Sequence, residues 1–168
     1  LPQTAGDTYN GDSTDQSYII NPDLIGAGEN ITIIDQGGNN SLELVGGLEI
    51  ASSTVISNQA QITLSNGTVI DIRGADTFNF KVGQNTAGGD TTGSELDFTE
   101  FAQNVLGVTV PAEGDDPVDG EGSTVNDDGT ATPGAPSSGP GGGGQEGETF
   151  TLTTGVSQLQ GDGNPEQY

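Results

Sequence analysis

The chain lacks cysteine, histidine and tryptophan, and only two of its 168 residues are Lys or Arg. Without Cys and His it has no disulfides, no thiolate nucleophile, no imidazole base and none of the usual zinc ligands. The shortage of Lys and Arg argues against a nucleic-acid partner, because phosphate contacts need cations. No apolar run is long enough to span a bilayer, so membrane insertion is not expected. These absences predict a protein that is not an enzyme.

The few basic residues face 25 Asp and Glu, which gives a formal net charge of −23. Self-repulsion of this size destabilises a compact state unless cations bind to it or screen it. Bound Ca²⁺, which prefers oxygen ligands, is one source of such cations. High external salt is the other. The composition is compatible with either source of cations, and calcium is the suspected cofactor.

Short runs of β-branched residues, separated by turn signals, fill the first two thirds of the chain. They predict an all-β body over residues 1–110, either a small β-sandwich or a degenerate β-solenoid, with one packed α-helix. The expected strands are Tyr18–Ile20, Ile31–Ile34, Ser41–Val45, Leu48–Ile50, Thr54–Ile56, Gln61–Leu64, Thr68–Ile72 and Thr77–Val82.

Two local patterns are specific enough to predict geometry. In the hairpin of residues 61–72, a Ser65-Asn66-Gly67 loop with Gly67 left-handed pairs Ile62 with Ile70 and keeps the apolar residues on one face. Further on, Asp97 and Glu100 form a capping box for a helix at about 97–106. The buried stripe of this helix is expected to consist of Phe98, Phe101, Ala102, Val105 and Leu106.

Beyond residue 110 the composition changes. Residues 111–148 are rich in Gly, Pro and acidic residues and predict a disordered linker. Residues 149–168 again contain a strand-like segment, in which Phe150, Leu152, Val156 and Leu159 are the candidate partner-binding side chains. This segment either pairs with a sheet edge, in its own molecule or a neighbour, or starts another module.

Two groups of oxygen-bearing side chains are candidate calcium ligands. Asp7, Asn10, Asp12 and Asp15 lie within nine residues around Gly11, and Asp35 and Asn39 flank Gly37-Gly38 together with Asn40. The alternative is ordinary turn chemistry, because Asn, Asp and Gly favour solvated turns.

Residues Ile33–Ile50 and Ser52–Gly83 resemble the last turn and the capping segment of haemolysin-type, or repeats-in-toxin, bacterial proteins. Phe150–Asn164 is similar to the entry into a repeat array in related surface-layer proteins. Only Gly37-Gly38 matches the opening of the family's calcium-binding nonapeptide, and Leu42 replaces its metal-binding Asp. The resemblance implies secretion, calcium-dependent order outside the cell, and a role as a toxin, protease, adhesin or surface layer.

The missing catalytic residues, the solvated surface and the strand-like segment on a flexible tether predict a structural subunit of an extracellular bacterial assembly, such as a surface layer, filament or biofilm matrix. We expect calcium to stabilise this assembly and β-strand addition to link its subunits. The expected partners of the subunit are copies of itself or other cell-surface proteins, and a glycan is a further candidate. The alternative is a calcium-dependent adhesin-type binding module of a larger secreted protein. The two differ in size in solution, since an assembly predicts polymers and a binding module predicts monomers.

Overall fold

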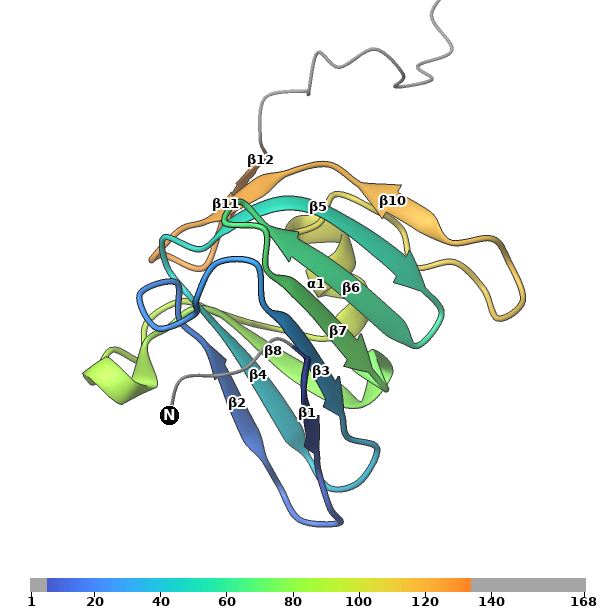
Figure 1. Cartoon of the computed structure of the whole chain (residues 1–168), viewed down its shortest axis with the longest axis horizontal. Helices are drawn as coiled ribbons and strands as arrows, with labels where there is room; N and C mark the ends of the chain where they lie inside the picture. Colours follow the sequence, from blue (N-terminus) through green and yellow to red (C-terminus); the bar gives the residue numbers. More distant parts are fainter. Residues whose placement is uncertain (1–5, 134–168) are drawn as a thin grey trace, which may run out of the picture. The chain divides into compact units, whose positions relative to one another are not determined.

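The computed structural model describes residues 6–133, which form two facing β-sheets and one α-helix (Figure 1). The first sheet has the order β1-β3-β7-β6-β5-β11-β12, with β10 also paired to β5, and the second has the order β2-β4-β8-β9. The strands of the first sheet are β1 (Asp7–Asn10), β3 (Asn30–Ile34), β5 (Glu49–Ile56), β6 (Gln59–Leu64), β7 (Val69–Arg73), β10 (Val118–Gly120), β11 (Ser123–Val125) and β12 (Ala131–Pro133); those of the second are β2 (Ser17–Ile20), β4 (Asn40–Val45), β8 (Phe78–Gly83) and β9 (Ser94–Leu96). The expected all-β fold is confirmed.

The chain passes from the first sheet to the second three times in the same sense. β1, β3 and β7 pair in parallel in one sheet, and β2, β4 and β8 pair in parallel in the other. Asp7 pairs with Ile31 and Ser17 pairs with Ser41, so partners in the first parallel pair of each sheet lie 24 residues apart. The parallel strands of successive passes stack as in a solenoid, and the two sheets face each other as in a sandwich. Neither a closed barrel nor a complete solenoid forms among residues 6–133.

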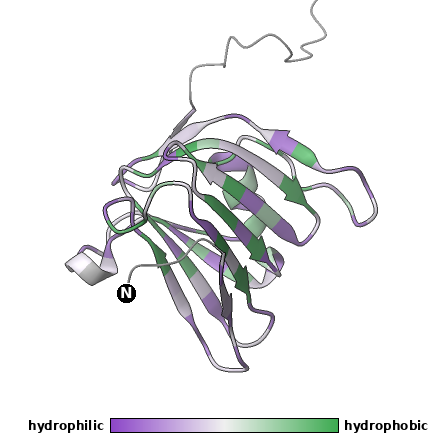
Figure 2. Cartoon of the chain, in the orientation of Figure 1, coloured by the Kyte–Doolittle hydropathy of each residue, from purple (hydrophilic) through white to green (hydrophobic). Residues whose placement is uncertain are grey.

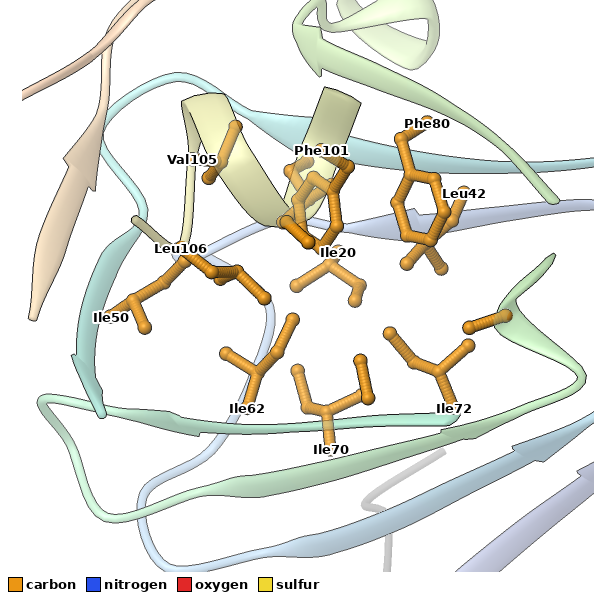
Figure 3. Close-up of a cluster of buried hydrophobic side chains, with 14 of the residues drawn as sticks. Ile20, Leu42, Ile50, Ile62, Ile70, Ile72, Phe80, Phe101, Val105 and Leu106 are labelled. Atoms are coloured by element: carbon orange, nitrogen blue, oxygen red, sulfur yellow. The ribbon is translucent and has the colours of Figure 1, made fainter. Parts of the chain in front are cut away.

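The core lies between the two sheets, where most inward-facing positions are apolar. Figure 2 shows hydrophobic and hydrophilic residues alternating along the central strands, as expected for strands with one buried face. In Figure 3, Ile62, Ile70 and Ile72 of the first sheet face Leu42 and Phe80 of the second. All five side chains are completely buried.

The β6–β7 hairpin has the predicted register. Ile62 pairs with Ile70, and the N–H of Leu64 donates to the carbonyl of Thr68 at 2.8 Å. Gly67 has φ = 85°, the left-handed conformation that a side chain disfavours. The three-residue loop therefore keeps the apolar face of both strands toward the core, as the sequence pattern indicates.

The predicted helix is α1 (Phe98–Asn104), with Asp97 as its N-cap. The capping box is present: Asp97 accepts from the N–H of Glu100 at 2.8 Å, and Glu100 accepts from the N–H of Asp97 at 3.1 Å. The ring of Phe101 stacks on Phe80, with centroids 4.1 Å apart and planes at 6°. The helix thus covers β8 and closes the core on that side.

The predicted start of the linker is wrong. Residues 118–133, within the expected linker 111–148, form β10, β11 and β12, and the first two pair with β5. The side chain of Val125 is fully buried in the core. These strands have three residues each and carry few apolar side chains, so the pairing of β10 and β11 depends on the edge that β5 supplies. The rest of the expected linker and the terminal segment, with Phe150, Leu152, Val156 and Leu159, lie outside the described residues.

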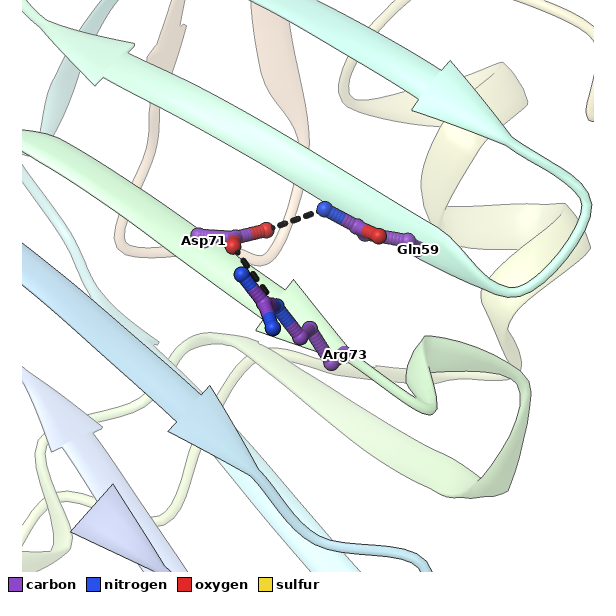
Figure 4. Close-up of polar contacts among 3 residues, drawn as sticks. All are labelled: Gln59, Asp71 and Arg73. Atoms are coloured by element: carbon purple, nitrogen blue, oxygen red, sulfur yellow. Dashed lines mark hydrogen bonds and ion pairs between the residues drawn. The ribbon is translucent and has the colours of Figure 1, made fainter. Parts of the chain in front are cut away.

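A polar cluster marks the outer face of the first sheet (Figure 4). Asp71 on β7 accepts from the side-chain amide of Gln59 at 2.5 Å and pairs with the guanidinium of Arg73 at 3.0 Å. An exposed ion pair of this kind contributes little to stability, on the order of 1 kcal/mol or less.

The one α-helix in residues 6–133 has seven residues, and no helix there is both long and apolar enough to cross a membrane.

Candidate functional site

Four of the six candidate calcium ligands, Asp12, Asp15, Asp35 and Asn39, lie in two turns that stack on each other. One turn joins β1 to β2 and the other joins β3 to β4, and the 24-residue register places them side by side. Oδ1 of Asp15 accepts from the backbone N–H of Asn39 at 2.8 Å and from its side-chain amide at 3.4 Å. The backbone N–H of Gln16 donates to Oδ1 of the buried Asn40 at 3.0 Å. The polar side chains therefore hold successive passes of the chain together.

Asp12 is exposed, and its carboxylate organises the first turn. Its Oδ1 accepts from the hydroxyl of Thr14 at 2.6 Å, from the N–H of Thr14 at 2.7 Å and from the amide of Gln16 at 2.6 Å. These hydrogen bonds, led by that of the Thr14 hydroxyl, lower the pKa of Asp12. Asp12 is therefore ionised and directed at its own turn.

Asp35 is the buried member of the group, with 1% of its surface exposed. Its carboxylate accepts from the hydroxyl of Tyr18 at 2.9 Å and from the N–H of Gly37 at 3.3 Å. Gly11 lies directly over this carboxylate, since a Cβ at that position would stand 2.0 Å from Oδ2 of Asp35. Burial, with the hydrogen bond to Asp35, raises the pKa of Tyr18 to about 12.

The six predicted ligands do not converge on one point. Asp7 and Asn10 lie at opposite ends of β1, whereas Asp12, Asp15, Asp35 and Asn39 lie in the stacked turns. Among residues 6–133, no three acidic side chains are arranged to hold a metal ion. Calcium binding therefore stays a prediction, and the contacts seen at these turns are hydrogen bonds within the protein.

A second feature lies beside the turns, at the end of the sandwich formed by β1 and β2. Here the two sheets leave an open, mainly apolar cavity of about 440 Å³ between them. It is lined by Tyr9, Ser17, Tyr18, Ile19, Ile20, Ile25, Ile31 and Ile33. We call this feature the open end.

The open end combines two edge strands with exposed apolar side chains. Among the strands of residues 6–133, β1 pairs with β3 and β2 pairs with β4, so β1 and β2 are the end strands of their sheets there. The two large hydrophobic side chains that stand out as exposed are Ile19 on β2, at 42%, and Leu24 in the following loop, at 81%. Edge strands next to an apolar opening form a surface suited to pairing with another segment.

The sequence pattern predicts strands at Tyr18–Ile20 and Ile31–Ile34 but does not mark them as the walls of a cavity. It predicts no strand at β1, because a four-residue strand with the sequence DTYN carries little pattern. The signal that could have found it is the 24-residue spacing, which aligns Tyr9 with Ile33 and Tyr18 with Leu42.

Glu43 is a further polar residue that the sequence did not single out. It lies on β4, is completely buried, and accepts from both the N–H and the hydroxyl of Thr86, each at 2.7 Å. Thr86 begins the short 3₁₀ helix Thr86–Gly88. Both carboxylate oxygens of Glu43 are thus engaged in holding this segment over the outer face of the second sheet.

Comparison of the chain with protein-family models, with curated proteins and with solved structures finds no match. The function must therefore be argued from the geometry of the open end and of the stacked turns.

Proposed function

We propose that the chain is a structural subunit of an extracellular bacterial assembly, a surface layer, filament or biofilm matrix, that grows by β-strand pairing between copies. The observation that carries the proposal is the open end, where β1 and β2, the end strands of the two sheets among residues 6–133, lie on either side of an apolar cavity. Natural β proteins usually protect sheet edges with charges, proline, bulges or a covering segment. Apolar side chains at the ends of both sheets are consistent with a partner strand.

The charge of the chain supports an extracellular, cation-rich setting. With a formal net charge of −23, copies of the chain repel one another at low ionic strength. Assembly then depends on cations, either screening the charge or bound as Ca²⁺ at the stacked turns through Asp12 and Asp15. The resemblance to haemolysin-type secreted proteins favours the same extracellular setting.

The stacked turns favour a second candidate, the calcium-dependent adhesin-type module. Asp12, Asp15 and Asn39 form an exposed polar surface at one end of the strands, where binding loops of β proteins commonly lie. This candidate predicts a monomer whose affinity for a surface partner depends on calcium.

The two candidates are separated by particle size in solution. Light scattering and electron microscopy of the full chain, with Ca²⁺ and after chelation, are compared with a chain that lacks residues 149–168. Ordered polymers that disappear in the shortened chain support the assembly, and their response to chelation shows whether calcium is needed. Monomers under every condition would exclude the assembly and leave the adhesin-type module.

A further inference from the structure

We propose that the cavity of the open end binds a small amphiphilic cation, an aliphatic or aromatic group that carries an ammonium. The apolar part of such a ligand lies between the two sheets, and its positive charge lies near the carboxylates that surround the cavity. This binding does not depend on the proposed assembly, because the residues that line the cavity belong to one chain.

The cavity has the size and the lining of a small-molecule site. Its volume of about 440 Å³ lies in the range of roughly 300–1,000 Å³ that is usual for ligand pockets. Ile20, Ile31 and Ile33 are buried and supply apolar wall. Tyr9 on β1 and Tyr18 on β2 add one aromatic ring from each sheet. Aromatic rings attract a cation to their faces, so this lining suits an apolar group that bears a positive charge.

Carboxylates lie close to this lining. Asp35 accepts the hydrogen bond of the Tyr18 hydroxyl at 2.9 Å. Glu29 directly precedes β3 and, in an extended chain, lies on the same side as Ile31 and Ile33 of the cavity wall. The Oε2 atom of Glu29 is buried and has no hydrogen-bond partner among the described residues. An ammonium is the kind of charged donor that this carboxylate oxygen lacks.

The two tyrosines indicate that the cavity disfavours negative charge. Burial, followed by the charges of Asp7 and Glu29, raises the pKa of Tyr9. Burial, followed by the hydrogen bond to Asp35 and its charge, raises the pKa of Tyr18 to about 12. A carboxylate or other anion in the cavity meets the same opposition, whereas a cation is favoured by the same charges.

No basic side chain offsets these carboxylates, since the chain has only two Lys and Arg. Arg73 pairs with Asp71 on the outer face of the first sheet. Lys81 alternates on β8 with the buried Phe80 and Val82 and therefore faces outward. A second copy of the chain is equally poor in cations, so a separate small molecule is the better source of the complementary charge.

Three probes with the same alkyl chain separate the effect of charge from that of apolar contact: hexylammonium, 1-hexanol and hexanoate. Their dissociation constants are measured by isothermal titration calorimetry on the full chain, at matched ionic strength and below the concentration at which light scattering detects polymers. We expect hexylammonium to bind at least about five times more tightly than hexanol, and hexanoate to bind more weakly than hexanol. Hexanol that binds as tightly as hexylammonium, or hexylammonium without saturable binding, would overturn the proposal.

Two tryptophan substitutions locate the site. Ile25→Trp places a large side chain at the cavity, whereas Leu24→Trp adds the same side chain at the neighbouring position, which is 81% exposed. We expect Ile25→Trp to abolish hexylammonium binding and Leu24→Trp to preserve it, with both variants unfolding in one cooperative transition. Equal affinity of the two folded variants would mean that the ligand binds elsewhere.

Two charge substitutions test the carboxylate next to the cavity without changing its shape. Glu29→Gln and Asp23→Asn each remove one negative charge from the connection between β2 and β3, and Asp23 is exposed. We expect Glu29→Gln to weaken hexylammonium at least about threefold and leave hexanol unchanged, and Asp23→Asn to change neither. If both substitutions weaken hexylammonium equally, the cation responds to net charge alone and the proposed site is wrong.

Discussion

The hydroxyl of Tyr18 on β2 donates a hydrogen bond of 2.9 Å to the carboxylate of Asp35, which follows β3. Tyr18 lies in the second sheet, whereas Asp35 directly follows a strand of the first sheet in the next pass of the chain. Because Asp35 is almost completely buried, this bond supplies one of the few donors that its charge receives. It also joins the stacked turns to the wall of the open cavity, where the ring of Tyr18 lies.

Tyr18→Phe is expected to lower the free energy of unfolding at neutral pH by about 1–3 kcal/mol, because a buried carboxylate loses a donor. It also changes the alkaline limb of stability. The pKa of Tyr18 is raised from 10.0 to about 12, so its contribution is complete below pH 10 and is lost as the pH rises through 12. Above pH 10, the free energy of unfolding measured by urea denaturation should therefore fall less steeply with pH for Tyr18→Phe than for the unchanged chain. Equal slopes would show that Tyr18 titrates normally.

Gly11→Ala is expected to disrupt the stacked turns, because its Cβ would stand 2.0 Å from the buried carboxylate of Asp35. Overpacking of this kind costs about 1–3 kcal/mol. Gly26→Ala is the matched control, since its Cβ meets only the end of the Glu29 side chain, which can move away. Chemical denaturation compares the two, and a silent Gly11→Ala would mean that the Asp35 carboxylate is not held beneath Gly11.

Val125→Ala tests the strands found within the expected linker. Val125 is fully buried, so truncating it should lower the free energy of unfolding by about 1.5–3 kcal/mol. Asp115→Ala, at an exposed position of the same acidic tract, should change stability by no more than about 0.5 kcal/mol. If residues 118–133 formed a disordered linker, neither substitution would change the melting temperature in thermal unfolding.

Calcium binding at the stacked turns predicts a rise in melting temperature with Ca²⁺ that Mg²⁺ or added NaCl at equal ionic strength does not reproduce. The double variant Asp12→Ala/Asp15→Ala should lose this rise. Asp115→Ala/Asp116→Ala removes the same charge from another exposed loop and should keep it. If calcium and NaCl raise the melting temperature equally in all three proteins, the cations act by screening.

The sequence was sufficient for elements whose signals are local. The three-residue loop at Gly67 and the capping box of Asp97 and Glu100 each lie within a few residues, and both were predicted with their pairing. Strands with regular alternation, such as that of Phe78, Phe80 and Val82, were also found because one face is buried. In these segments propensity, periodicity and turn chemistry agree.

The elements that the sequence did not predict depend on distant partners. Parallel pairing of β3 with β7 joins residues across an inserted hairpin, and no local pattern records such a register. β11 contributes only Val125 to the core and is held by β5, so its own composition resembles a linker. The open end was missed for the same reason, since it is defined by which strands end the two sheets.

The shared 24-residue offset in both sheets has a consequence for how such a gene can change. An in-frame loss of residues 6–29 would remove one strand from each sheet together and leave β3 and β4 as the new ends. A duplication of the same length would lengthen the body by one pass and keep every other pairing unchanged. The molecule can therefore vary in length by whole passes, with each length presenting edges of the same kind.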